Sequence, residues 1–243
     1  MLAVWWILCQ VVGWSDTAKP YTDHSGAVLP PITVFDEQGD SFSLLSLFNT
    51  QPVLLLPIYT SCPHSCSAIT EGWKEALETL GEPGKSLTVI TFSFDHRDTP
   101  ADLKRFRRRW KLPVDSWYVV SADSAAIDTL LEAIGMPVRW DDRLQIYTHP
   151  NLAVFLTAGA RISSYYVGVS PDPGSIRKAI TAASQNLQGI SWWDRAWTQC
   201  FVYDPVTGEI QFDVSILIHL AAGIIVLSSL IFFFLRNRIR AAR

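Results

Sequence analysis

Two mainly apolar runs, at residues 53–59 and 87–94, constrain the fold of this chain more than any other feature, and the first of them is continuous. The run at 53–59 has no polar alternation, which is typical of a strand that is covered on both faces of a sheet, and we expect 87–94 to be a second buried strand. Between the runs, apolar residues recur at helical spacing as far as Leu80, with Pro63 near the start and Gly81 just past the end. A strand, a helix and a second strand in this order predict an α/β structure with parallel pairing.

The same alternation continues along the chain. We expect helices at 100–110, 122–134 and 172–187, a strand at 117–120, and a hairpin of strands at 152–156 and 162–167. Two short runs at 32–35 and 41–44 flank a turn at Asp36-Glu-Gln-Gly39, which predicts an N-terminal hairpin. The pattern therefore predicts one globular domain at 32–190 with a mostly parallel sheet flanked by helices, after a polar linker at 16–31.

Hydrophobic segments near both ends indicate contact with a membrane. Residues 1–15 carry an apolar run of about eleven residues, which suits a signal peptide or a short N-terminal anchor. Residues 214–235 are apolar over a length that spans a bilayer, and they follow an aromatic juxtamembrane segment at 191–213. The arginine-rich tail at 236–243 is expected in the cytoplasm by the positive-inside rule, which places the globular domain outside it.

The charge and the cysteines exclude two classes of protein. A formal net charge of −3 argues against a nucleic-acid binder, because neutralising phosphates requires a basic surface. Of the four cysteines, only Cys62 and Cys66 lie close together, whereas Cys9 and Cys200 are far from them and from each other. The chain is therefore not a disulfide-stapled miniprotein, and the close pair is expected to serve chemistry.

The motif Cys62-Pro-His-Ser-Cys66 lies at the expected start of a helix. A helix N-terminus favours thiolate over thiol, and thiolate is both a nucleophile and a soft metal ligand that copper(I) selects. If the helix begins at or before Cys62, both sulfurs project from one face and can share an ion. The three intervening residues, where dithiol oxidoreductases typically have two, favour metal binding and leave disulfide chemistry open. His64, inside the motif, is expected to be solvent-exposed.

Several motifs together resemble the Sco/SenC family of copper chaperones. They are Tyr59-Thr-Ser-Cys-Pro-His-Ser-Cys66 after the first apolar run, Phe92-Ser-Phe-Asp-His-Arg-Asp-Thr-Pro100 after the second, and His149 ahead of the hairpin. The resemblance covers about 29–187. Cys200-Phe-Val-Tyr-Asp-Pro-Val-Thr-Gly208 and the C-terminal apolar segment are similar to a bacterial subgroup with its membrane anchor at the carboxyl end.

The resemblance implies a thioredoxin-like α/β fold, with a mixed central sheet flanked by helices, an N-terminal hairpin and a C-terminal transmembrane helix. It also implies that copper is bound by Cys62, Cys66 and His149. Asp95 corresponds to an acidic residue that the family has near the metal. His96 stands where the family usually has proline, and it is a second candidate neighbour of the site.

By the same resemblance, the expected function is copper delivery to the CuA site of a respiratory cytochrome c oxidase, by a metallochaperone rather than an enzyme. The alternative is a membrane-anchored thiol-disulfide oxidoreductase that uses Cys62 and Cys66 to reduce the cysteines of that copper site. The expected partners are the oxidase copper-site subunit, membrane lipid around the C-terminal helix, and other copper chaperones or a thiol reductant. The expected location is the bacterial inner membrane, with the domain on the periplasmic side.

One basic run is not explained by copper binding or by thiol chemistry. It comprises Lys104, Arg105, Arg107, Arg108, Arg109 and Lys111. Such a run is most often a solvated helix face, and the alternative is a docking surface for anionic lipid or for an acidic partner protein.

Overall fold

The computed structural model describes residues 21–186 except 63–64 and 170, together with 201–203 and 210–212; the side chains at 63–68 lie outside the description. The chain divides into two units, Met1–Ile190 and Ser191–Arg243. In the second unit, the described residues form the antiparallel pair β10 (Phe201–Tyr203) and β11 (Ile210–Phe212).

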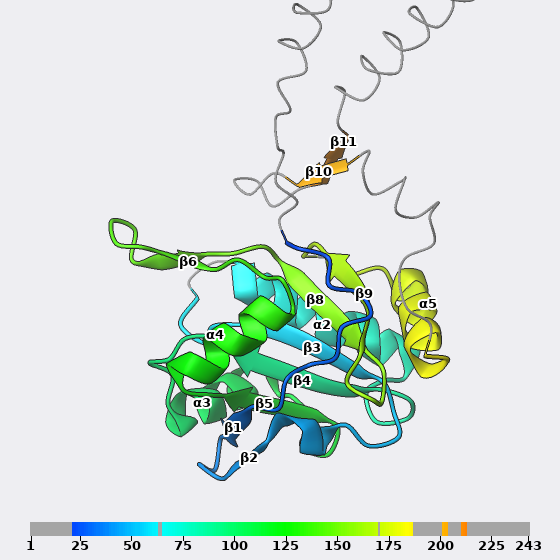
Figure 1. The fold of residues 1–243 in the computed structure, drawn as a ribbon, viewed down its shortest axis with the longest axis horizontal. Coiled ribbons are helices and arrows are strands. Elements are labelled where there is room, and N and C mark those ends of the chain that lie inside the picture. Colours follow the sequence, from blue (N-terminus) through cyan, green and yellow to red (C-terminus); the bar gives the residue numbers. More distant parts are fainter. Residues whose placement is uncertain (1–20, 63–64, 170, 187–200, 204–209, 213–243) are drawn as a thin grey trace, which may run out of the picture. The chain divides into compact units, whose positions relative to one another are not determined.

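The first unit is built on a seven-stranded sheet (Figure 1). Its strands are β1 (Thr33–Asp36), β2 (Ser41–Ser43), β3 (Val53–Ile58), β4 (Thr88–Ser93), β5 (Trp117–Ser121), β8 (Leu152–Leu156) and β9 (Ile162–Val167). In space the order is β2-β1-β5-β4-β3-β8-β9. This mixed sheet confirms the expected fold class, and β1 with β2 forms the expected N-terminal hairpin.

The expectation of a mostly parallel sheet is wrong. Strand β4 is parallel to β3 and to β5, whereas the other neighbours in the sheet pair in the antiparallel sense. The reason is that the sheet is extended on both sides by hairpins, β1–β2 and β8–β9, and a hairpin joined by a short turn is antiparallel. Only the helical crossovers in the middle of the chain require parallel strands.

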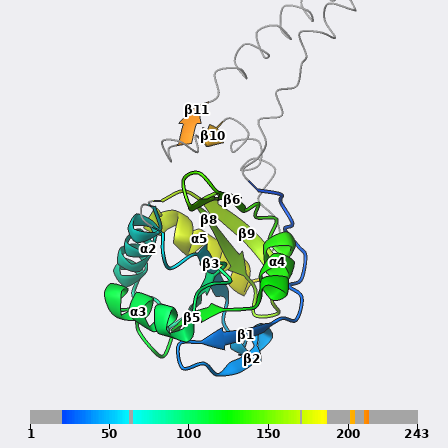
Figure 2. The same ribbon diagram turned by 90° about the vertical axis from the view of Figure 1, so that its left-hand side faces the viewer.

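Four helices cover the sheet. They are α2 (Ser65–Leu80), α3 (Pro100–Trp110), α4 (Ser124–Ala133) and α5 (Pro173–Ser184), and a short 3-10 helix, η1, spans Leu44–Leu47. Figures 1 and 2 show α2 and α3 on one face of the sheet and α4 on the opposite face. Helix α5 packs against α2 and against β8 and β9. Because both faces are covered, β3 has no solvent-facing side, which accounts for its continuous apolar sequence.

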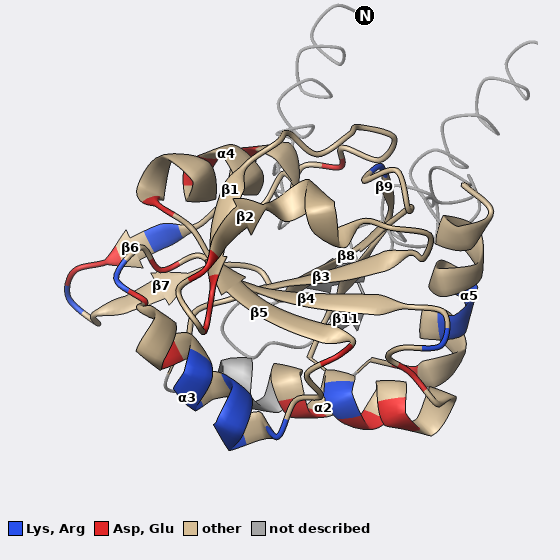
Figure 3. Cartoon of the chain, turned by 90° about the horizontal axis from the view of Figure 1, so that it is seen from below, with Lys and Arg blue, Asp and Glu red and all other residues tan. Residues whose placement is uncertain are grey.

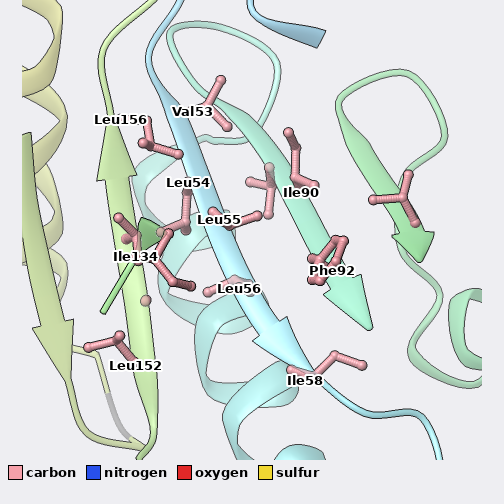
Figure 4. Packing of buried hydrophobic residues seen from close by; sticks show 14 of the residues in the cluster. Val53, Leu54, Leu55, Leu56, Ile58, Ile90, Phe92, Ile134, Leu152 and Leu156 are labelled. Atoms are coloured by element: carbon pink, nitrogen blue, oxygen red, sulfur yellow. The ribbon is translucent and has the colours of Figure 1, made fainter. Parts of the chain in front are cut away.

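The centre of the core is β3, in which every residue is buried (Figure 4). Leu54 and Leu55 are fully buried between the apolar side chains of β4 and β8. A buried tryptophan on β5, Trp117, keeps its polar atom satisfied, because its Nε1–H donates to Thr91 Oγ1 at 2.9 Å. This packing holds the ends of β3 and β4 in fixed register.

The described part of the segment assigned to a linker, residues 21–31, is attached to the domain. The amide of Thr22 donates to the carbonyl of Gly135 at 2.7 Å, and the amide of Leu29 donates to the carbonyl of Ala160 at 2.9 Å. Leu29 is buried in the core. These bonds extend the domain toward the N-terminus beyond the expected start at residue 32.

No helix among the described residues has the length and apolar character needed to cross a bilayer. The transmembrane segment predicted at 214–235, the signal segment at 1–15 and the tail at 236–243 lie outside the described residues, as does most of the aromatic segment at 191–213.

Candidate metal site

The loop that carries Cys62 directly follows β3. Its shape is set by the chain itself, because the amide of Cys62 donates to the carbonyl of Tyr59 at 3.3 Å. The side chain of Cys62 is buried, with 9% of the residue exposed. Helix α2 begins at Ser65, so Cys62 precedes the helix and Cys66 lies in its first turn. The arrangement in which both cysteines share one helical face is therefore not the one observed, although the pair does straddle the helix N-terminus.

Asp98 fixes this loop from the neighbouring strand. It follows β4, is 8% exposed, and accepts hydrogen bonds from the Thr60 amide at 3.0 Å and from the Thr60 hydroxyl at 2.7 Å. The hydroxyl of Ser93, at the end of β4, also donates to Asp98. A buried carboxylate with three donors is well compensated for its loss of hydration. Asp98 thus ties the end of β4 to the residue two positions before Cys62.

Sheet topology brings His149 to the same place. Strand β8 runs antiparallel to β3, so β8 begins at the edge where β3 ends. His149 lies three residues before β8, and its ring makes edge contacts with Tyr59, at 5.8 Å between ring centroids, and with Phe94, at 5.0 Å. Because Tyr59 is also the backbone partner of Cys62, the imidazole lies beside the Cys62 loop.

The imidazole of His149 is held in a defined orientation. Its Nδ1 lies 3.0 Å from the carbonyl oxygen of Pro150. A carbonyl only accepts hydrogen bonds, so this contact assigns the proton to Nδ1 and leaves the lone pair on Nε2. Burial lowers the pKa of His149, against the opposing effects of the Pro150 carbonyl and of the Cys62 charge. The neutral ring is the form that binds metals.

Next to His149, a short hairpin is clamped to the loop after β4. Its strands are β6 (Arg139–Asp141) and β7 (Ile146–Thr148). The guanidinium of Arg97 stacks on Trp140 at 4.4 Å and pairs with Asp95 through two bonds of 2.8 Å, while the Tyr147 hydroxyl donates to Asp95 at 3.3 Å. Because β7 ends one residue before His149, this clamp reaches the polypeptide that carries the imidazole.

Asp95 is the electrostatic centre of the clamp and is only 2% exposed. Burial alone raises the pKa of Asp95, but the hydrogen bonds and charge of Arg97, with the bond from Tyr147, outweigh burial and lower it below its usual value. In turn, burial and the charge of Asp95 raise the pKa of Tyr147. At neutral pH the clamp is therefore a carboxylate, a guanidinium and a neutral phenol.

The structure brings some of the predicted site residues together and leaves others apart. His149 lies beside the Cys62 loop, because its ring contacts Tyr59, the backbone partner of Cys62. Asp95 approaches this place through Tyr147, whose ring is 5.2 Å from that of Tyr59, and His96 is exposed. Among the described side chains, no group of three or more His, Cys, Asp or Glu could hold a metal ion. The predicted ligand set includes Cys66, whose side chain is outside them.

The comparison with protein families agrees with this architecture. The profile of the SCO1/SenC family matches residues 22–184, which is more than half of the chain. The chain belongs to the SCO1/SenC family. No curated protein sequence matches the chain.

Solved structures share the fold of this SCO1/SenC domain. A protein of Aquifex aeolicus VF5, proposed to be an electron transfer protein, is 35% identical, with a TM-score of 0.62 over 65% of this chain and 93% of its own. BsSco, described as a Sco-family cytochrome c oxidase assembly protein with a disulfide switch, is 23% identical, with a TM-score of 0.57 over 66% of this chain and 95% of its own. Copper-bound ScoI of Bradyrhizobium japonicum is 20% identical, with a TM-score of 0.54 over 65% and 99%. The last two show the thioredoxin-like fold.

Two features of this SCO1/SenC domain were not predicted from the sequence. One is the role of Asp98, which lies within the Phe92–Pro100 motif, shortly after a buried strand, and was given no role there. The other is the hairpin β6–β7, which is signalled by a turn at 141–145: the Asp141 side chain accepts from the amides of Arg143 and Leu144, both at 2.9 Å. An aspartate that accepts hydrogen bonds from the next backbone amides is typical of a turn, and here it lies between the aromatic residues Trp140 and Tyr147. This hairpin signal is weaker than those of the longer helices and strands.

Proposed function

We propose that this protein is a copper metallochaperone that helps insert copper at the CuA site of a respiratory cytochrome c oxidase. The observation that carries the proposal is the position of the His149 ring, from a distant part of the chain, beside the loop that carries Cys62. Membership of the SCO1/SenC family supports the same conclusion.

The chemistry of the donors suits copper. In the proposed site, Cys62 and Cys66 supply thiolates and His149 supplies Nε2, the atom left with a lone pair by the Nδ1 contact to Pro150. Thiolate and imidazole are the donors that copper(I) prefers, whereas magnesium or calcium requires oxygen. Three protein donors leave one side of the ion open to an acceptor. Copper is therefore a cargo that the protein binds and hands over, so no chemical turnover is assigned.

Solved relatives support both parts of this proposal. ScoI of Bradyrhizobium japonicum has been solved with copper bound, and BsSco belongs to the Sco family of cytochrome c oxidase assembly proteins. The partner that follows is the copper-site subunit of an oxidase. Other copper chaperones or a thiol reductant would supply the metal or keep Cys62 and Cys66 reduced.

The rival function is thiol-disulfide exchange that reduces the cysteines of the oxidase copper site. It is favoured by the position of Cys62 just before α2, because a thiol at a helix N-terminus is a good nucleophile. The disulfide switch described for BsSco is in line with such chemistry. The two functions use the same sulfurs and differ in their need for His149.

For location, we propose that the domain lies on the periplasmic side of a bacterial inner membrane. The segment at 214–235 would anchor it and the tail at 236–243 would be cytoplasmic, as their apolar and arginine-rich sequences indicate.

The proposal is tested by anaerobic copper(I) titration of the reduced full chain, in competition with a chromogenic chelator. We expect one tight equivalent, lost in Cys62→Ser and Cys66→Ser and weakened at least tenfold in His149→Ala. Cys200→Ser and His96→Ala are matched controls that should bind like the parent. If His149→Ala also binds like the parent while the parent reduces insulin disulfides, the oxidoreductase function replaces the chaperone.

A further inference from the structure

Helix α3 presents an exposed basic face. Five of its cations are at the surface: Lys104, Arg105, Arg108, Arg109 and, at the C-cap, Lys111. Figure 3 shows this basic stretch of α3 on the same side of the sheet as α2. Arg107 differs from them, because it is largely buried and forms an ion pair with Glu37. One arginine of the run therefore holds α3 to the domain, and the others are available to solvent.

The basic face borders a groove that reaches the Cys62 loop. Arg105, Arg108 and Arg109 line a half-open groove of about 520 Å³. Its remaining lining residues are Asp102, Phe106, Thr60 and Ser61. Phe106 is buried and supplies an apolar wall. Thr60 and Ser61 immediately precede Cys62, so an occupant of the groove lies within a few residues of the proposed copper-binding thiol.

Most of the positive charge in the groove is uncompensated. Asp102 forms the capping box of α3 with Thr99 and pairs with Arg105. Within the described part of the chain, no ion pair joins Arg108 or Arg109 to an acidic residue. Arg109 stacks on Trp110, with the guanidinium 5.2 Å from the ring centroid, which limits its orientations. Cations in the last turn of a helix are stabilised by the helix dipole, but the dipole does not explain why these arginines line a groove beside the Cys62 loop.

We propose that this groove docks an acidic segment of the partner protein that exchanges copper or electrons at Cys62. The inference rests on the proposed function and adds that the partner's docking segment is acidic and binds beside α3. Guanidinium groups suit carboxylates because they form paired hydrogen bonds, and Phe106 offers contact to an apolar residue between the acids. A concave groove with an apolar wall fits a peptide segment, whereas lipid headgroups are attracted by an open basic patch.

The test uses a peptide that reacts with a thiolate of the Cys62–Cys66 motif, so that its rate reports how well it docks near this motif. A short peptide carries one cysteine activated as a mixed disulfide with thionitrobenzoate and flanked by four glutamates and a phenylalanine; its twin has glutamines for the glutamates. Attack by a motif thiolate on the peptide sulfur forms a protein–peptide disulfide and releases thionitrobenzoate, whose colour gives the rate. The reference is the reduced full chain with Cys9→Ser and Cys200→Ser, in a non-ionic detergent.

At low salt we expect the acidic peptide to react roughly ten times faster than its glutamine twin, as electrostatic steering would produce. The double substitution Arg108→Gln and Arg109→Gln should reduce this ratio to below about two. The same charge change on α5, Arg177→Gln with Lys178→Gln, should leave the ratio unchanged. A ratio near one in the reference, or an equal ratio in both double variants, overturns the proposal.

Two further measurements separate the alternatives. In nanodiscs containing phosphatidylglycerol, the ratio of the two peptide rates should remain higher for the reference than for the Arg108→Gln and Arg109→Gln variant. If the two ratios become equal in these nanodiscs, anionic lipid occupies the groove and the proposal is overturned. Copper(I) titration of the same variants should give the affinity of the reference. If the reference itself binds no copper, the proposed function fails, while the peptide rates still decide whether the groove docks acidic segments.

Discussion

Asp98 accepts two hydrogen bonds from Thr60, one from the amide at 3.0 Å and one from the hydroxyl at 2.7 Å, and so links the loop after β4 to the loop that carries Cys62. The two loops follow parallel neighbours in the sheet, and strand register alone brings them close. Asp98 converts this proximity into a fixed geometry. The candidate metal site is thus supported by a residue that does not belong to the predicted ligand set.

We predict that Asp98→Ala lowers the free energy of unfolding by about 3 kcal/mol, because three buried donors lose their charged acceptor. Asp98→Asn keeps the shape and part of the acceptor capacity and should cost about half as much. Urea denaturation of the full chain measures both. The control is Asp128→Ala, an exposed carboxylate on α4, which should change stability by less than about 0.5 kcal/mol. Equal losses at positions 98 and 128 would contradict the assigned role.

The clamp between Arg97 and Trp140 should matter more for copper than for stability. Arg97 is half exposed, so its contribution to the free energy of unfolding is small. Trp140→Ala removes the stacking surface of Arg97 and frees the hairpin that precedes His149. We predict a copper(I) affinity about twofold to tenfold lower, which corresponds to a cation–π contact of about 0.4 to 1.4 kcal/mol.

The same chelator competition measures this effect. A double-mutant cycle with Arg97→Gln should show coupling, because either substitution breaks the same contact. Additive losses in the cycle would mean that Trp140 acts independently of Arg97. The number of thiols titrated by a disulfide reagent should be the same in all four proteins, which separates a displaced imidazole from oxidised cysteines.

Asp95 should make the stability of the domain depend on pH in the acid range. Its pKa is lowered in the folded protein despite burial, through Arg97 and Tyr147. The stabilisation is therefore complete above the usual aspartate pKa of about 3.9, and it is lost as the pH falls through the lowered folded value. The free energy of unfolding of the parent should fall more steeply below about pH 4 than that of Asp95→Asn. Parallel curves for the two proteins would exclude this linkage.

The sequence predicted those elements best whose signals are local. Helix α3 and the hairpin β8–β9 have the bounds that the pattern predicted, because Pro100 at the helix start and the turn at 157–160 punctuate the chain. The sense of strand pairing was not local, and there the expectation of a mostly parallel sheet failed. The β6–β7 hairpin was missed because its strands have three residues each, too few to establish a periodicity.

The candidate site shows the same division. Cys62 and Cys66 stand out by spacing alone, but nothing near His149 in the sequence links it to them; only the family resemblance singled it out. Its position depends on β8 pairing with β3 in the antiparallel sense, a long-range contact that local patterns do not contain. Asp98 and Trp140 act through other side chains, and such roles become visible only once the loops are placed in space.

The contact between Gly135 and Thr22 predicts how the N-terminal segment is held. Gly135 has a φ of +63°, and a Cβ built there would lie 2.0 Å from the backbone oxygen of Thr22. Gly135→Ala must therefore strain its own backbone and displace the segment, for a predicted loss of about 2 to 4 kcal/mol. The control, Gly39→Ala, also has a positive φ, but its Cβ would lie 3.8 Å from Pro100 Cγ, so the cost should be about 1 kcal/mol.

Thermal and urea unfolding of the two variants measures this difference, and limited proteolysis locates it. Cleavage near residues 21–28 should be accelerated in Gly135→Ala and unchanged in Gly39→Ala, because only the former breaks the bond from the Thr22 amide to the Gly135 carbonyl. If both variants lose the same stability, the positive φ accounts for the whole effect. The close approach of the two backbones would then contribute nothing, and attachment of the N-terminal segment would depend on Leu29 and its bond to Ala160 instead.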